Sequence, residues 1–212
     1  MKSTQKGCGG KDNDVILPIL APVKTIIETP KRGRIVEAYF DEAIEDAFQY
    51  RDLIQKMRAM TEDDELHLLI HCPGGDVNTA VQLYNEIISC KAKTVAHLYH
   101  AYSAGGIITL ACDEVIVKEF ATFMCHNVAY GVRGKGAEAR NMVEFINKTS
   151  DKLMYHIYDG FLTKDELKTM LKDEDFWFDE DEIKARLAGW TPIRRKRKEK
   201  AEKAQKVTKK QA

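Results

Sequence analysis

One unit recurs three times in this chain and constrains its fold more than any other feature. Each copy consists of a short apolar strand, a turn of small residues and a departing helix. The copies begin at residues 66, 93 and 121, and the third continues through the glycine-bearing turn 130–136 into a long amphipathic helix. Strands that alternate with helices in this way predict an α/β domain with a largely parallel sheet.

Shorter elements surround these units. Residues 34–40 predict a strand, and residues 41–60 carry apolar side chains at helical spacing, among them Ile44 and Phe48. Asp76 is placed to cap the helix of the first unit. These features extend the α/β pattern toward the N-terminus.

Two further helices are predicted near the C-terminus. Thr163 with Glu166, and Asp179 with Glu182, each have the spacing of a capping box. Gly189 is expected to end the second of these helices.

The charge distribution suggests three regions. We expect residues 1–14 to be disordered, residues 15–190 to form the folded domain, and residues 191–212 to form a basic tail or a solvated helical extension. Residues 194–210 hold ten Lys or Arg against two Glu, a net charge of +8, whereas the whole chain is formally neutral. Such a tail could bind nucleic acid or an acidic surface, or could serve only for solubility.

Composition narrows the class of protein. The five Cys lack C-x-x-C spacing, which predicts reduced thiols and a cytoplasmic location. No apolar run approaches the roughly 18 residues that span a bilayer. We expect no cofactor. We also expect no metal, because His67 and His71 would lie too far apart on their strand, and His97 and His100 would point to opposite faces.

The turns of the three units carry the chemistry. Parallel strands end at the same edge of a sheet, which should bring Gly75, Ser103 and His126 together. Ser103 alone is compatible with a helix N-cap, but a neighbouring His would make it a nucleophile. The backbone N–H groups of Gly75 and Ala104 would then face the negative charge of a tetrahedral intermediate. A third, acidic group is available at 173–175.

Four segments of the chain together resemble a known family. The segments "LIHCPGGDVNTAVQLYNEI", "AYSAGGIITLA", "ATFMCHN" and "DEDFWFDEDEI" resemble, in order and spacing, the proteolytic subunit of the ATP-dependent Clp protease, over about residues 15 to 190. Phage and prophage relatives look most similar. The resemblance implies the ClpP/crotonase-like fold, with the long helix after residue 136 as a protruding handle through which two rings stack.

The resemblance also implies roles for particular residues. Ser103 would be the nucleophile, His126 the general base and Asp175 the orienting acid, with Gly75 and Ala104 as the oxyanion hole. A slip of one or two residues in the alignment would move the acid to Asp173 or Glu174. Ala104 stands where the family usually has Met.

The implied function is a serine endopeptidase. Its subunits would form homo-oligomeric rings that degrade polypeptides delivered by a Clp-type ATPase unfoldase. Alternatives with the same fold are a phage maturation (prohead) protease, a phage scaffold protein whose tail touches DNA, and a crotonase-type acyl-CoA enzyme. The last of these would not need the succession Ser, His, Asp.

Overall fold

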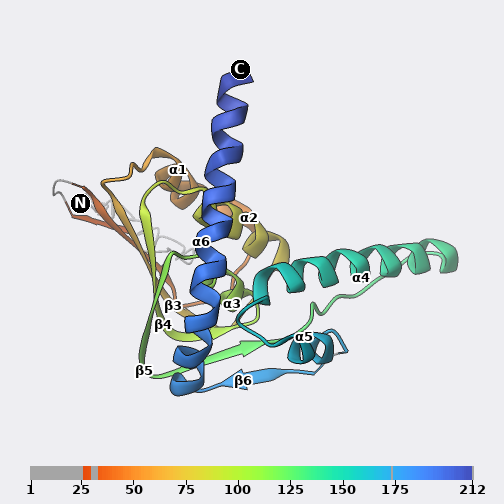
Figure 1. Cartoon of the computed structure of the whole chain (residues 1–212). Helices are drawn as coiled ribbons and strands as arrows, with labels where there is room; N and C mark the ends of the chain where they lie inside the picture. Colours follow the sequence, from red (N-terminus) through yellow and green to blue (C-terminus); the bar gives the residue numbers. More distant parts are fainter. Residues whose placement is uncertain (1–25, 30–32, 173, 212) are drawn as a thin grey trace, which may run out of the picture.

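The computed structural model describes residues 26–29, 33–172 and 174–211 of the chain. Six strands form a single sheet in sequence order (Figure 1). They are β1 (Ile26–Thr29), β2 (Ile35–Phe40), β3 (Glu65–Cys72), β4 (Lys93–Tyr102), β5 (Glu114–Cys125) and β6 (Phe176–Phe178). Strands β2 to β5 pair in parallel, while β1 and β6 pair antiparallel at the two edges. The predicted α/β class with a largely parallel sheet is confirmed.

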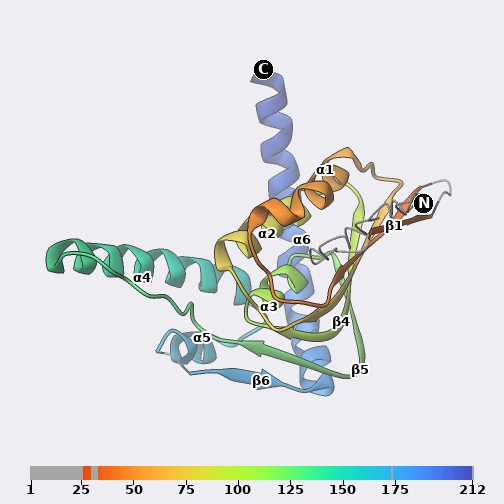
Figure 2. The ribbon, with the colours of Figure 1, turned by 180° about the vertical axis from the view of Figure 1, so that it is seen from behind.

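Helices connect the strands. They are η1 (Ala47–Tyr50), α1 (Arg51–Ala59), α2 (Val77–Ser89), α3 (Ala104–Thr109), α4 (Gly136–Tyr158), α5 (Lys164–Met170) and α6 (Glu180–Gln211). Figure 2 shows α1, α2 and α3 gathered on one side of the sheet. In both views α4 projects away from the body, and the C-terminal part of α6 extends beyond it in another direction. The predicted disorder of residues 1–14 concerns a segment outside the described residues.

The core lies between the helices and one face of the sheet. Alternate residues of β3 are buried, as its apolar pattern requires, and Leu66, Leu68 and Ile70 are fully inaccessible. Asp76 caps α2 by accepting a hydrogen bond from the Thr79 amide, as predicted.

The helix predicted over 41–60 begins later than expected. Residues 41–46 are irregular, and Ile44 instead forms an isolated bridge with Gly75. The side chain of Phe48 is 59% exposed and does not belong to the core. This bridge to the turn of the first unit buries Ile44. The apolar side chain at this position is therefore explained by a contact between distant segments and not by helical periodicity.

Gly189 does not end a helix, so that prediction is wrong. The capping boxes at Thr163 and Asp179 are present, but α6 continues through Gly189 and Pro192 to Gln211. A Cβ on Gly189 would lie 3.3 Å from the carbonyl oxygen of Gly160, so this glycine permits a close crossing of the chain.

The part of α6 beyond residue 190 is not all solvated. The Arg194 side chain is buried and donates from Nε to the Ala111 carbonyl at 2.6 Å, with Asp113 beside its guanidinium at 3.3 Å. Lys198 also contacts Asp113. The first turns of the predicted tail therefore pack on the body, and the domain division at residue 190 stays a prediction.

Candidate active site

Ser103 occupies the turn between β4 and α3. Its backbone has φ 51° and ψ −117°, a conformation that non-glycine residues rarely adopt. Ser103 stands at the N-cap position of α3, yet its side chain makes no capping hydrogen bond. Strain of this kind persists where surrounding structure enforces it, and it directs the hydroxyl away from the helix.

Gly105 and Gly106, two and three residues after Ser103, must be small. A Cβ on Gly105 would lie 3.0 Å from the Cys72 Cβ, and one on Gly106 would lie 2.8 Å from the Phe123 ring. Both glycines allow α3 to approach strands β3 and β5 closely. The sharp turn at Ser103 depends on this approach.

His126 follows β5 directly and meets Ser103 across the parallel pair β4–β5. Tyr102 is in register with Met124, and the Ser103 amide donates to the Met124 carbonyl at 2.9 Å. The Ser103 Oγ lies 2.7 Å from Nε2 of His126. With the ring proton on Nδ1, the hydroxyl donates its hydrogen to Nε2, which is the geometry that general-base activation requires.

Asp175 lies just before β6 at the sheet edge. Cys125 pairs with Phe176, so the antiparallel strand β6 brings Asp175 toward His126. The Asp175 Oδ1 lies 4.0 Å from Nδ1 of His126, longer than a hydrogen bond, and the Asp175 side chain is 55% exposed. Glu174 is exposed, and Asp173 lies outside the described residues.

Side chains from α5 and α6 hold β6 in place. The Arg186 guanidinium lies 4.1 Å from the centre of the Phe178 ring and forms two hydrogen bonds with the Glu166 carboxylate, at 2.6 and 2.9 Å. The hydrogen bonds from Arg186, together with those from Thr163, lower the pKa of Glu166 to about 2. This ion pair fixes the strand that follows Asp175.

The turn of the first unit presents the Gly75 amide. Ile44 clamps this turn, because its amide donates to the Gly74 carbonyl and its carbonyl accepts from the Asp76 amide, both at 2.7 Å. Gly75 has φ 136°, and a Cβ there would lie 2.1 Å from the Ile44 carbonyl oxygen, so only glycine fits.

The Ala104 amide is the second predicted donor. Ala104 is the first residue of α3, and N–H groups in a helix's first turn have no partner inside the helix. Gly75 and Ala104 both line the same cavity as Ser103 and His126.

This cavity has a volume of about 300 Å³ and a wall of mixed polar and apolar character. Val77, Ile107 and Met154 contribute to the wall, with Tyr158 beside them. A second cavity of about 430 Å³ shares Val77 and Val128 with the first and continues along α4. A chain in extended conformation could therefore pass Ser103 and leave along this helix.

A cluster on the opposite face of the sheet was missed by sequence reasoning. The Thr122 hydroxyl lies 2.7 Å from both the Tyr102 hydroxyl and Nδ1 of His100, and the Tyr102 ring lies 5.2 Å from the ring of Trp177. Tyr102, Thr122 and Trp177 stand on β4, β5 and β6, one to four residues from Ser103, His126 and Asp175 respectively. The aromatic residues Tyr102 and Trp177, within two positions of Ser103 and Asp175, were the available signal.

The histidine pairs form across strands. A register shift between Leu98 and His100 places His97 and His100 on the same outer face, so the prediction of opposite faces is wrong. His67 and His97 have ring nitrogens 2.8 Å apart, and the rings of His71 and His100 lie 4.7 Å apart.

Neither a metal-binding cluster nor a membrane-spanning helix occurs among the described residues. In the part of the chain that the structure describes, no three His, Cys, Asp or Glu side chains gather as a metal site. Over the same residues, no helix combines the length and apolar character that crossing a bilayer requires.

Comparisons with known proteins agree with this fold. The model of the family described as Clp protease matches residues 31–186. Uncharacterized protein MJ0137 of Methanocaldococcus jannaschii is 35% identical over 71 residues, which cover 33% of this chain and 25% of that protein. Uncharacterized protein MJ1495 of the same organism is also 35% identical over 71 residues, 24% of its length. The match thus spans about a quarter of these curated relatives.

Proposed function

The chain belongs to the Clp protease family, and we propose that it is a serine endopeptidase in which Ser103, His126 and Asp175 form the catalytic triad. The observation that carries the proposal is the 2.7 Å separation between the Ser103 hydroxyl and Nε2 of His126. The absence of a side-chain cap on α3 supports it further, because a purely structural Ser would bond to the helix amides.

The first half of the reaction forms an acyl-enzyme. Nε2 of His126 accepts the hydroxyl proton while Ser103 Oγ bonds to the peptide carbonyl carbon. The carbonyl oxygen becomes an oxyanion and accepts hydrogen bonds from the Gly75 and Ala104 amides. His126 then gives its proton to the amine nitrogen, the C–N bond breaks and the amine leaves.

The second half repeats these steps with water. His126 removes a proton from water, and the resulting oxygen attacks the acyl carbon. Collapse of the second oxyanion breaks the ester bond, and His126 returns the proton to Ser103 Oγ. Asp175 holds the Nδ1–H tautomer of His126 and stabilises the imidazolium. A shift of about 1 Å would convert their 4.0 Å separation into a hydrogen bond.

The substrate is an extended polypeptide. Val77, Ile107 and Met154 in the wall of the 300 Å³ cavity suit an uncharged side chain next to the cleaved bond, and the neighbouring cavity offers room for further residues. In a ring-forming protease of the Clp type, selectivity would depend mainly on which chains reach the site. Polypeptides unfolded by a Clp-type ATPase in the cytoplasm fit that requirement.

Assembly into rings is expected. Clp proteases usually form oligomeric rings. The outer part of α4 projects from the body and exposes Met142 and Phe145, at 51% and 66%, which supports contact with another copy.

One observation separates the peptidase from its alternatives. A crotonase-type enzyme needs the paired amides but has no use for a hydroxyl bonded to an imidazole, so the Ser103–His126 contact favours a peptidase. A phage maturation protease would share the triad and differ only in its substrates.

The test is covalent labelling by a fluorophosphonate together with hydrolysis of a fluorogenic peptide. Wild-type protein should be labelled once per chain, whereas Ser103→Ala should lose both labelling and hydrolysis and keep the oligomer size. Ser89→Ala, on α2, is the matched control and should behave as wild type. Labelling that persists in Ser103→Ala would refute the nucleophile.

A further inference from the structure

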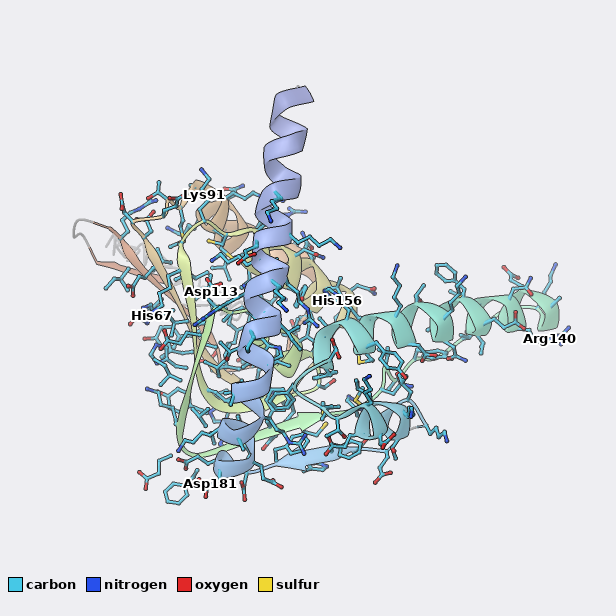
Figure 3. The ribbon with its side chains drawn as sticks, viewed as in Figure 1. His67, Lys91, Asp113, Arg140, His156 and Asp181 are labelled. Atoms are coloured by element: carbon cyan, nitrogen blue, oxygen red, sulfur yellow. The ribbon has the colours of Figure 1, made fainter. Side chains whose placement is uncertain are left out.

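A cationic groove of about 520 Å³ lies between the C-terminal end of α4 and the middle of α6. Lys196, Arg197 and Lys200 line it from α6 and His156 from α4, while Asp159 is the one acid among its described lining residues. Figure 3 shows His156 beside α6. We call this feature the α4–α6 groove.

The packing of the α4–α6 groove holds its cations in place. Arg197 donates from Nη1 to the Ile157 carbonyl at 3.3 Å, and His156 Nε2 lies 3.1 Å from the Tyr84 hydroxyl. Burial lowers the pKa of His156, and the charges of Arg197 and Lys200 lower it further. The groove therefore carries a positive potential that its single carboxylate does not cancel.

A second hollow on the molecule lacks this excess of positive charge. The hollow beside Trp190 has a volume of about 660 Å³ and is also lined by cations of α6, including Arg195 and Lys198. There, however, four acidic side chains balance four basic ones. Of these two hollows, the α4–α6 groove is the one in which basic side chains outnumber acidic ones.

Lysines continue from the groove along α6. Lys196, Lys200 and Lys203 are exposed and separated by four and three residues, which places them on one side of the helix. The sequence repeats this spacing at Lys206 and Lys210. From 196 to 210 the helix rises about 21 Å, and in Figures 1 and 2 the C-terminal end of α6 stands clear of the body.

The composition of this surface distinguishes among anionic partners. Protein interfaces are enriched in aromatic residues and depleted in Lys, whereas the sequence after residue 193 has no aromatic residue and Val207 as its one large aliphatic residue. Tyr155 and Ile193 line the groove itself, but the helix beyond it has no Trp, Phe or Leu, the residues with which an amphipathic helix enters a membrane surface. Regular lysines act as point charges and suit a phosphodiester backbone without reading bases.

We propose that the α4–α6 groove and the lysines that follow it bind the phosphate backbone of nucleic acid without sequence specificity. This site is separate from Ser103 and does not depend on the proposed peptidase. Its occupant is double-stranded nucleic acid held by counterion release, so affinity falls steeply with salt.

The test uses the whole chain of 212 residues in the assembly state in which it is purified, and measures the anisotropy of a fluorescein-labelled DNA duplex of about 25 base pairs over a range of NaCl concentrations. The variant Lys196→Gln/Lys200→Gln/Lys203→Gln should bind about 10- to 100-fold more weakly, and its log–log salt slope should fall by about 2 to 3. The control Lys91→Gln/Lys164→Gln/Lys172→Gln removes the same charge from exposed lysines elsewhere and should bind as wild type.

Two further measurements test whether the site binds nucleic acid without sequence specificity and independently of the proposed peptidase. A duplex of unrelated sequence should bind equally well, and peptide hydrolysis by the triple variant should equal that of wild type. The proposal is overturned if both triple variants weaken binding equally, if wild type does not bind the duplex, or if polyglutamate or phosphatidylserine vesicles bind more tightly than DNA.

Discussion

His126 is held at different distances by its two neighbours: its Nε2 lies 2.7 Å from the Ser103 hydroxyl, whereas its Nδ1 lies 4.0 Å from the Asp175 carboxylate. The difference follows from the sheet. Ser103 and His126 end two long, parallel, in-register strands, while Asp175 precedes a strand of three residues at the edge. The proposed nucleophile and base are therefore held more firmly than the proposed acid.

Replacement of the acid tests this arrangement. Asp175→Asn should lower kcat for a fluorogenic peptide by about 10²–10⁴, because the imidazole loses the charge that stabilises its protonated form. Glu174→Gln and Asp173→Asn are the matched controls and should retain wild-type kcat. If Glu174→Gln or Asp173→Asn proves the more damaging change, the acid has been assigned to the wrong carboxylate.

The oxyanion donor can be tested through its glycine. Gly75→Ala places a Cβ 2.1 Å from the Ile44 carbonyl oxygen at φ 136°, so the turn must move. Loss of one oxyanion donor costs about 10²–10³ in kcat, and we expect at least that loss. Gly131→Ala is the control, because a Cβ there meets no atom within 4 Å. Circular dichroism should show that the Gly75 variant remains folded, and equal kcat for both variants would contradict the assignment.

Acid should destabilise the fold through Asp64. Hydrogen bonds from the Arg34 side chain, then from the Thr61 and Arg34 amides, hold the pKa of this buried carboxyl well below its usual range. A lowered folded-state pKa favours folding fully above the unfolded value of about 4, and this contribution is lost as the pH falls below it.

Urea unfolding at about pH 7 and about pH 3 measures this effect. Asp64→Asn should reduce the free energy of unfolding by about 1.5–3 kcal/mol at neutral pH and should narrow the difference between the two pH values. Asp63→Asn changes the exposed neighbouring residue, and it should alter neither the free energy of unfolding at neutral pH nor its difference between the two pH values. Equal pH dependence in wild type and Asp64→Asn would contradict the prediction.

Phe120 should be replaceable with a gain in stability. Its backbone has φ 61°, its side chain is 79% exposed, and its amide donates to the Glu180 carboxylate at 2.8 Å. The left-handed conformation costs a non-glycine residue about 1–2 kcal/mol, and Asn tolerates it better than Phe. Phe120→Asn should therefore raise the free energy of unfolding by about 0.5–1 kcal/mol. Phe48→Asn, at an exposed position with ordinary backbone, should give no such gain in the same urea titration.

The meeting of the three turns was predictable because parallel strands end at a common edge. This simple rule places Gly75, Ser103 and His126 together from the alternation of strands and helices alone. Asp175 was harder to place, because its short antiparallel strand has no periodic pattern long enough to fix the register.

Other features depend on contacts that no local pattern records. Gly189 has the local signature of a helix end, yet it serves a close crossing with the Gly160 turn. The register shift after Leu98 likewise reverses the expected side of His100, because a bulge breaks the two-residue period of a strand. In both cases tertiary packing overrides the local signal.

The outer-face ring of Trp177 should position Asp175. Trp177 follows Asp175 by two residues and lies against Tyr102, the residue before the nucleophile, whose hydroxyl bonds to Thr122 on β5. These contacts join the three strands that carry the triad, on the face opposite the cavity. A misplacement of 1 Å costs about 10²-fold in catalysis, and the Asp175–His126 separation is already 4.0 Å. Loosening β6 should therefore lower kcat.

We therefore expect Trp177→Ala to lower kcat by about 10- to 100-fold with little change in KM, because the cavity that binds substrate does not contain this ring. Trp177→Phe keeps a ring against Tyr102 and should recover most of the lost kcat. The double variant Trp177→Ala/Asp175→Asn should be no slower than Asp175→Asn alone, because a ring that acts through the carboxylate has nothing left to position once the charge is gone. Additive losses in the double variant would show instead that Trp177 supports the fold in general and has no specific link to Asp175.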